Sequence, residues 1–314
     1  MGRLDGKAVI VTGGGGLLGA AFCHQLAAEG ARVLVNDIVG ERAESVMTEI
    51  QDAGGEASVF EGSVDSWERG ARISEACVER FGRIDCLVNA AHATRSVPLM
   101  ELQEETFHAT LDSHVTGHFA CTHHCVRQMV KQGEGGSVVN LISRAMQGMR
   151  GLSAYGAAKG AILSATFSWA LELAEHRIRV NAISPAARRR EPGEAISQRM
   201  PWRREPGQSL EEMRAQTPTP ESVAPLVVFL ASDASDWISG QGIFLAGDSL
   251  ALIRHPREDR FAFMPEGWSI EQLERHFRHC FGAAMERPSM QAAPYAWHEG
   301  VGPRRPPAEE GPDR

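Results

Sequence analysis

The feature that most constrains the fold of this chain is a strand, a glycine-rich turn and a helix in direct succession near the N-terminus. Residues 8–11 read as a short apolar strand, residues 12–19 as the turn, and residues 20–27 as the start of an apolar helix. Bare backbone lets a pyrophosphate approach the turn, and the helix N-terminus stabilises its charge. The alternative is a glycine-rich hairpin or linker, which the flanking patterns disfavour. The turn therefore predicts a dinucleotide-binding sheet.

A carboxylate ends the second expected strand. Residues 32–37 are apolar in the middle and finish at Asp37, 18 residues after Gly19. A carboxylate at this place accepts hydrogen bonds from both ribose hydroxyls of NAD and repels the 2′-phosphate of NADP. The alternative is a surface aspartate at a strand end. With the glycine turn before it, and no Lys or Arg in that turn, Asp37 predicts NAD as the cofactor.

Strand and helix patterns alternate through most of the chain. Further strands are expected at 57–60, 86–89, 137–141, 179–183 and 242–246, the last of the series. Helices are expected at 41–53, 66–81, 104–131 and 153–176, and another one opens at Thr219-Pro220-Glu221. This alternation predicts an α/β fold, a Rossmann-type doubly wound parallel sheet with helices on both faces. One dinucleotide-binding catalytic domain is expected over residues 1–254.

Three segments stand outside the alternation. Residues 186–216 are rich in Arg, Pro and Glu and follow a sheet strand, so we expect a lid beside the ligand site. Its arginines, Arg203 and Arg204 among them, either hold an anionic carrier such as CoA or pair with neighbouring glutamates in a solvated loop. Residues 255–286 are expected to form a helical extension, opened by a capping box at 269–272. Residues 287–314 are expected to be disordered.

Composition excludes several kinds of partner. The net charge of −8 provides no basic face for nucleic acid. No apolar run approaches the roughly 18 residues of a membrane span. Six cysteines without a Cys-x-x-Cys pair, and an N-terminus that enters a strand at once, are typical of a reduced intracellular protein. We therefore expect a cytoplasmic protein that acts on a small molecule.

One helical stripe carries potential metal ligands. His114, His118, Cys121 and Cys125 share a face of the expected 104–131 helix, and a metal site there is conceivable. Packing of soft side chains within the protein accounts for the same pattern, and we predict no metal.

The strongest catalytic pattern lies at Tyr155 and Lys159. The two residues are four apart on an expected helix and so share a face. A phenol with a reference pKa of about 10 is a poor base at neutral pH, and an adjacent ammonium lowers that pKa. Ser143, at the end of the preceding strand, can hydrogen-bond the same oxygen. The three residues suit proton exchange at an alcohol or carbonyl oxygen; the alternative is an ordinary amphipathic helix.

Together these residues resemble the short-chain dehydrogenase/reductase family over about residues 5–250. The motifs that carry the resemblance are the turn 12–19, Asp37, Val88–Ala91, Ser143, Tyr155–Lys159, Arg179–Pro185 and Ser239–Gln241. Within the family, the runs 117–123 and 224–232 and the Tyr155 helix look most like hydroxyacyl-CoA and hydroxysteroid dehydrogenases. Those are relatives of the multifunctional β-oxidation enzyme.

The resemblance implies roles for individual residues. Tyr155 is the general acid/base, Lys159 binds the nicotinamide ribose and lowers the Tyr155 pKa, and Ser143 positions the substrate oxygen. His114 occupies the place of an asparagine that often completes the catalytic set. The implied cofactor-binding residues are Gly13, Gly16, Leu17, Leu18, Gly19, Asp37, Val64, Asn89, Ala90, Ala91, Tyr155, Lys159 and Pro185. The family also implies a homo-oligomer, dimer or tetramer, that pairs the 104–131 and 153–176 helices.

Several positions depart from the family pattern, and they keep other functions open. Leu17 stands where a glycine is usual, Ser63 where an aspartate often meets the adenine, and the residues after Pro185 lack the usual Gly and Thr. The first hypothesis is an NAD-dependent oxidoreductase acting on a secondary alcohol or ketone of a bulky substrate. The second is a non-redox lyase, isomerase or cyclase on the same fold. The third is a cofactor-binding protein without turnover.

Overall fold

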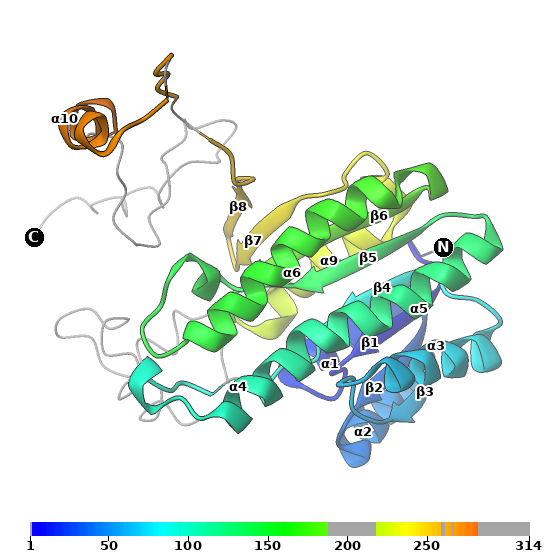
Figure 1. Cartoon of the computed structure of the whole chain (residues 1–314). Helices are drawn as coiled ribbons and strands as arrows, with labels where there is room; N and C mark the ends of the chain where they lie inside the picture. Colours follow the sequence, from blue (N-terminus) through cyan, green and yellow to red (C-terminus); the bar gives the residue numbers. More distant parts are fainter. Residues whose placement is uncertain (1, 94, 188–217, 259–260, 266, 282–314) are drawn as a thin grey trace, which may run out of the picture.

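The computed structural model describes residues 2–93, 95–187, 218–258, 261–265 and 267–281. In these residues eight strands form one sheet, ordered β3-β2-β1-β4-β5-β6-β7-β8 (Figure 1). The strands are β1 (Ala8–Thr12), β2 (Arg32–Asp37), β3 (Glu56–Glu61), β4 (Cys86–Asn89), β5 (Gly136–Leu141), β6 (Ile178–Pro185), β7 (Gly242–Ala246) and β8 (Ser249–Ile253). All neighbours pair in parallel except β7 and β8. The predicted doubly wound parallel sheet is confirmed.

Helices cover both faces of this sheet, because its central strands are apolar on both sides. Val9 and Val11 of β1 belong to the apolar core under α1 (Leu17–Ala28), α2 (Gly40–Asp52) and α9 (Ala224–Ala231). Ala8 and Ile10 point to the opposite face, into the core under α3 (Trp67–Phe81), α5 (Gly117–Gln132) and α6 (Ser153–Glu172). Because β1 to β7 run in parallel, their carboxyl ends lie at one edge of the sheet, between the two layers of helices.

The chain reverses its direction across the sheet at β1. From β1 it moves through β2 to β3, and then crosses back to β4 on the other side of β1. Thr12, at the end of β1, is in register with Asn36 of β2 and Asn89 of β4. Ligands of open α/β sheets bind in the crevice at such a reversal. The glycine turn after Thr12 opens into this crevice.

A widened turn interrupts the helix that was expected over 104–131. The described structure has α4 (Glu104–Leu111), a π-helical turn at Asp112–Thr116 and then α5. The expectation of one regular helix was wrong in this detail, because backbone hydrogen-bond spacing is not visible in apolar periodicity. Single π-helical turns within α-helices are frequent at functional sites, and this one contains His114.

The expectation that 242–246 is the last strand was wrong. β8 follows β7 directly and pairs with it, with Ala246 in register with Ser249. The two residues between them are Gly247, with a φ of 60°, and Asp248. A two-residue loop with glycine at positive φ is a favoured β-hairpin turn. Residues 250–253 of β8 are an apolar run, yet Leu250 and Leu252 are exposed in the structure.

The N-termini of α3, α9 and α10 can be compared with the capping residues that the sequence indicates. The Ser66 hydroxyl accepts a hydrogen bond from the Arg69 amide at 3.3 Å, so α3 begins after it. Thr219 is extended and makes no side-chain cap, and a 3₁₀ turn at Pro220–Ser222 precedes α9. The predicted capping box forms: Ser269 and Gln272 exchange hydrogen bonds of 2.7 and 3.2 Å at the start of α10 (Ile270–Phe281).

Two predicted segments fall mainly outside the described residues. Of the lid expected at 186–216, the structure describes only Ala186 and Ala187, and the tail expected at 287–314 lies wholly outside. The division into domains stays a prediction. In the described ranges, no helix is long and apolar enough to span a membrane.

Candidate active site

The glycine turn provides a surface of bare backbone at the start of α1. Gly13 has a φ of 65°, and a Cβ atom on it would lie 2.7 Å from the Ala91 Cα. A Cβ on Gly19 would collide with the Gly13 carbonyl. Gly16 is the N-cap of α1 and provides no side-chain cap, so no side chain competes for the first amides of the helix, at Leu17 and Leu18. Uncapped amides and absent side chains fit a pyrophosphate group.

Thr12 fastens the loop after β4 to this turn. Its hydroxyl accepts hydrogen bonds from the Ala90 amide at 3.1 Å and the Ala91 amide at 3.2 Å. Two features therefore keep Ala91 close to the turn: the hydrogen bond to Thr12 and the absence of a Cβ atom on Gly13. Val64 lies on the same side and packs under Gly117, where a Cβ would lie 2.6 Å from the Val64 side chain. These residues form one wall of the crevice.

The Asn89 side chain belongs to a buried polar chain under the crevice. Its amide group donates to the Thr122 hydroxyl and to the Asn140 side-chain oxygen, both at 3.0 Å. Asn140 in turn donates to the Thr166 hydroxyl at 3.0 Å. The chain links α5, β4, β5 and α6. Asn89 thus has a scaffold role that its motif did not predict, and its side-chain donors are already used.

Asp37 is almost fully buried beside the turn and holds it. Its carboxylate accepts hydrogen bonds from the Gly15 amide at 3.1 Å and from the Val39 amide at 3.0 Å. Each carboxylate oxygen keeps a free lone pair for a further donor.

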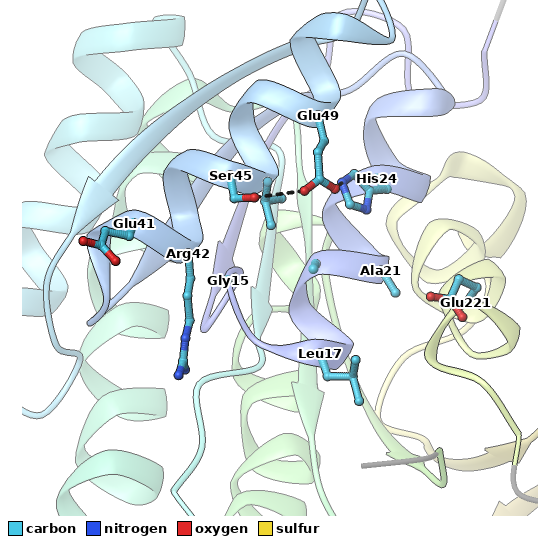
Figure 2. Close-up of a pocket in the computed structure, with 11 residues that line it drawn as sticks. Gly15, Leu17, Ala21, His24, Glu41, Arg42, Ser45, Glu49 and Glu221 are labelled. Atoms are coloured by element: carbon cyan, nitrogen blue, oxygen red, sulfur yellow. Dashed lines mark hydrogen bonds and ion pairs between the residues drawn. The ribbon is translucent and has the colours of Figure 1, made fainter. Parts of the chain in front are cut away.

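A basic residue lies next to Gly15 that the sequence pattern did not reveal. A Cβ on Gly15 would lie 2.7 Å from the Arg42 Cβ of α2. Figure 2 shows the Arg42 side chain extending from α2 alongside the turn, at the rim of a pocket of about 430 Å³. In the same pocket, His24 Nε2 lies 3.1 Å from a carboxylate oxygen of Glu49. The absence of Lys and Arg within the turn therefore does not mean that no cation is near it.

Lys159 lies buried between α6 and the end of β5. Its ammonium donates a hydrogen bond of 2.6 Å to the Leu141 carbonyl, and its Nζ lies 5.7 Å from the centroid of the Tyr155 ring. Burial lowers the Lys159 pKa from 10.5 to about 7, because an ammonium loses hydration in the interior. The predicted pairing of Tyr155 and Lys159 on one helix face is present.

His114 faces the same tyrosine from the π-helical turn. Its ring lies 5.2 Å from the Tyr155 ring in an edge-to-face arrangement, and its Nε2 lies 2.9 Å from the Ala93 carbonyl oxygen. Burial and then the charge of Lys159 lower the His114 pKa to about 3. The ring is therefore neutral at physiological pH and donates through Nε2.

Ser143 and Pro185 lie at the same edge of the sheet, at the carboxyl ends of β5 and β6. The Ser143 hydroxyl accepts a hydrogen bond from the Ala145 amide at 3.2 Å and caps the 3₁₀ turn Arg144–Gln147. That turn packs against the start of α6, where a Cβ on Gly156 would lie 2.6 Å from the Ala145 carbonyl oxygen. Pro185 ends β6. The residues proposed from sequence thus all lie at or beside the carboxyl ends of the strands.

The stripe of His114, His118, Cys121 and Cys125 is buried. Burial raises the Cys121 pKa to about 12, so this thiol stays protonated. Among the described residues, no cluster of three or more His, Cys, Asp or Glu side chains has the arrangement of a metal site.

Comparison with known proteins decides the family. Residues 7–198 match the profile of the short chain dehydrogenases. The chain belongs to this family.

Individual short-chain dehydrogenases agree with the assignment. The chain is 34% identical over 251 residues to the 3-oxoacyl-[acyl-carrier-protein] reductase of Thermotoga maritima, covering 78% of this chain and 98% of that protein. It is 30% identical over 270 residues to the peroxisomal hydratase-dehydrogenase-epimerase of Saccharomyces cerevisiae, covering 83% of this chain and 28% of that protein. A crystal structure of a Mycobacterium avium short chain dehydrogenase superposes with a TM-score of 0.78 at 32% identity, covering 90% of this chain and 96% of the other.

Membership of this family establishes the general class of reaction. Short-chain dehydrogenases are oxidoreductases that use a nicotinamide cofactor, NAD or NADP. The bare glycine turn and the uncapped start of α1 fit such a dinucleotide.

Proposed function

We propose that this protein transfers a hydride between NAD and a secondary alcohol or ketone of a bulky substrate, with Tyr155 as general acid/base. The observation that carries the proposal is the position of the Tyr155 ring. It lies close to both the buried Lys159 ammonium, at 5.7 Å, and the neutral His114 ring, at 5.2 Å, at the sheet edge that bears the glycine turn. A bound nicotinamide supplies the hydride acceptor or donor, and the chain supplies position and proton transfer.

Each side chain of the set has a distinct role in the proposal. Lys159 places a positive charge near the Tyr155 phenol and so favours its ionised form. The half-buried Ser143 hydroxyl uses an acceptor lone pair on Ala145 and keeps its hydrogen to donate to the substrate oxygen. His114 is held by Ala93 with its ring edge against Tyr155, and so limits where that ring can lie.

The preference for NAD over NADP rests on Asp37. Its carboxylate lies at the end of β2, beside the turn that would bind the adenosine half of the cofactor. A 2′-phosphate would be placed close to this negative charge in a site with little solvent, where repulsion is strong. Arg42 opposes this effect in part, since its guanidinium lies by the same turn.

A bulky acyl substrate would find exposed apolar side chains on the segment between β4 and α4. Leu99 and Met100, in a 3₁₀ turn after β4, are 71% and 96% exposed. The chain just before this turn is joined to the loop before α6, because the Val97 amide donates a hydrogen bond of 2.8 Å to the Gly151 carbonyl. The names of the two relatives, a 3-oxoacyl-carrier reductase and a peroxisomal hydratase-dehydrogenase-epimerase, favour 3-oxoacyl or 3-hydroxyacyl thioesters as first substrates to test.

The test is absorbance at 340 nm with NAD or NADH against a panel of thioesters, steroids and simple ketones. Turnover that requires Tyr155 supports the proposal. Cofactor binding with no change in absorbance for any member would favour the non-redox enzyme, which the departures at His114 and after Pro185 motivate, or the protein without turnover. Whether the lid arginines Arg203 and Arg204 bind a CoA carrier is tested by comparing a CoA thioester with a short neutral thioester.

We further propose a cytoplasmic homo-oligomer with no nucleic-acid or membrane partner. The outer face of α5 and α6 carries apolar side chains that their own chain leaves partly uncovered. Phe119 and Trp169 contact each other with ring centroids 4.7 Å apart, and Leu171, on another side of α6, is 81% exposed. Such a face fits a two-fold contact between copies of the chain.

A further inference from the structure

The residue that follows Ser143 contacts a strand on the far side of β6. The Arg144 side chain lies over the ring of Phe244 in β7, with its guanidinium carbon 5.0 Å from the ring centroid. Both residues are half-buried. A guanidinium over an aromatic face is held by electrostatic attraction, which grows as water is removed from the pair. This contact therefore joins the 3₁₀ turn Arg144–Gln147 to the sheet.

The same turn packs against the helix that bears Tyr155. A Cβ atom on Gly160 of α6 would lie 3.9 Å from the Met146 Cβ, which is an ordinary packing distance. Ala145 of the turn belongs to a small apolar cluster against which the Tyr155 side chain packs. The turn thus contacts α6 through Ala145 and Met146, and β7 through Arg144. Its position depends on both sets of contacts.

Phe244 lies on a strand that is paired on both sides. It is in register with Ser184 of β6 and with Ala251 of β8. Ile253 of β8 and Met146 of the turn pack against one apolar cluster, so the second strand of the hairpin supports the turn as well. Because both edges of β7 are hydrogen-bonded, the backbone that carries the Phe244 ring is fixed, and the ring gives Arg144 a defined surface.

The direction of the Ser143 hydroxyl depends on the position of this turn. The hydroxyl oxygen accepts a hydrogen bond from the Ala145 amide at 3.2 Å. This distance is at the long end of the range for N–H···O hydrogen bonds, so a small shift of the turn away from Ser143 breaks the bond. The hydroxyl is then free to rotate, and its hydrogen no longer has one preferred direction.

We propose that Arg144 is a positioning residue for Ser143. Its stacking on Phe244 holds the turn at the distance where the Ala145 amide fixes the Ser143 hydroxyl. The inference rests on the proposed function, in which that hydroxyl donates to the substrate oxygen. The alternative is that the stack adds stability and nothing else. The two readings differ in what they predict for the Ala145 amide and for kcat.

Hydrogen exchange of the Ala145 amide, followed by NMR, reports the bond to Ser143 without substrate or cofactor. Arg144→Met keeps the side-chain stem and removes the guanidinium, and Phe244→Leu removes the aromatic face. Each should raise the exchange rate of this amide by about three- to tenfold. The double variant should exchange no faster than the faster single variant, because both changes remove one contact. Arg144→Lys keeps a cation and should restore part of the protection.

The catalytic readout is kcat with the best substrate of the panel. In Arg144→Met and Phe244→Leu it should fall by about the same factor as the exchange rate rises, while the Kd for NADH stays unchanged. Arg32→Met is the matched control, since the Arg32 guanidinium lies 5.6 Å from the centroid of the Phe81 ring and Arg32 begins β2, at the opposite edge of the sheet. It should lower Tm and leave both the Ala145 exchange rate and kcat unchanged.

Three results would overturn the inference: an Ala145 exchange rate that neither variant changes, an equal rise in Arg32→Met, or faster exchange with an unchanged kcat in an active enzyme. Phe244→Leu tests the contact from its other side, so the inference stays open to refutation if Arg144→Met does not fold. A protein with the expected exchange pattern but no redox turnover would refute the proposed function alone. Arg144 would then still be the residue that fixes the Ser143 hydroxyl.

Discussion

Asp37 accepts a hydrogen bond from the amide of Gly15 at 3.1 Å. The side chain that is proposed to select the cofactor therefore also holds the turn that binds it. The Val39 amide donates to the other carboxylate oxygen at 3.0 Å, so the carboxylate joins the glycine turn to the segment that follows β2. Selectivity and local stability are coupled at this residue, and they can be separated because one depends on charge and the other on hydrogen bonding.

Substitutions of Asp37 should separate these effects. Asp37→Asn removes the charge and keeps one of the two acceptor oxygens, so the ratio of the Kd for NADPH to that for NADH should fall by about tenfold, with a smaller loss of Tm than in Asp37→Ala. Asp37→Ala should give a similar ratio and also lower the free energy of unfolding, by about 1–3 kcal/mol for the lost hydrogen bonds. Fluorescence titration with both reduced cofactors and calorimetry measure the two quantities. Equal affinity of the wild type for NADH and NADPH would contradict the proposed preference.

Arg42 should act in the opposite sense to Asp37. Arg42→Ala removes a cation beside Gly15, so binding of NADPH should weaken more than binding of NADH. The effect should be larger in the Asp37→Asn background, where the 2′-phosphate is no longer repelled. Arg72, exposed on α3 and paired with Glu75, provides a control substitution of the same charge. A loss of NADPH affinity in Arg72→Ala as large as in Arg42→Ala would refute a specific role.

Tyr155→Phe should abolish most turnover and leave cofactor affinity within a few-fold of the wild type. A general acid/base group contributes about 10²–10⁴ in rate, and the phenyl ring keeps the edge contact with His114. The measurement is kcat with the best substrate of the panel, together with the Kd for NADH. Tyr295→Phe removes the same hydroxyl elsewhere in the chain and is the matched control. Retained turnover in Tyr155→Phe would place the chemistry on other groups.

The buried Lys159 should make stability depend on pH. Its folded pKa of about 7 lies below its ordinary value of 10.5, so between these values the unfolded chain binds more protons than the folded one. The destabilisation from burying this amine is therefore complete below pH 7 and disappears as the pH rises toward 10.5. Lys159→Met should be more stable than the wild type at pH 6, and the difference should shrink steadily toward pH 10. Chemical denaturation across this range measures it, and a difference that does not vary with pH would contradict the prediction.

A charge on the outer face of α6 should weaken the proposed oligomer. Leu171→Glu places a carboxylate at an exposed apolar position of α6, on another side of the helix from Trp169, and should shift the population toward monomers at micromolar concentration. Trp237→Glu is a suitable control, since Trp237 is 78% exposed but lies between α9 and β7. Light scattering reads the mass of each variant. A monomeric wild type would refute the oligomer, and equal dissociation by both variants would place the interface elsewhere.

The fold was predictable because each of its main features leaves a local trace in the sequence. The strand, glycine turn and helix at residues 8–28 and the alternation that follows them determine a doubly wound sheet, and the structure agrees. β8 left a short trace, the Gly247-Asp248 turn and an apolar run at 250–253, which the expectation of a last strand at 242–246 did not use. The π-helical turn left none, because apolar spacing continues through it.

The candidate site was predictable in its residues but not in their contacts. Tyr155, Lys159 and Asp37 follow from spacing and position. The use of the Asn89 side chain in a buried chain with Thr122 and Asn140, and the approach of Arg42 to Gly15, depend on packing between elements far apart in sequence. Arg144 carried no signal of its own, because its stacking on Phe244 joins a turn and a strand that are far apart in the sequence.

Because of the π-helical turn at Asp112–Thr116, the position of His114 beside Tyr155 depends on the number of residues in this helix. Such a turn holds one residue more than a regular α-helical turn, and it brings His114 against Tyr155 while α5 keeps its packing on β4. Deleting a single residue here would regularise the helix and rotate either His114 or the whole of α5 by about 100°. A change that removes no functional side chain would then uncouple Tyr155 from its neighbours.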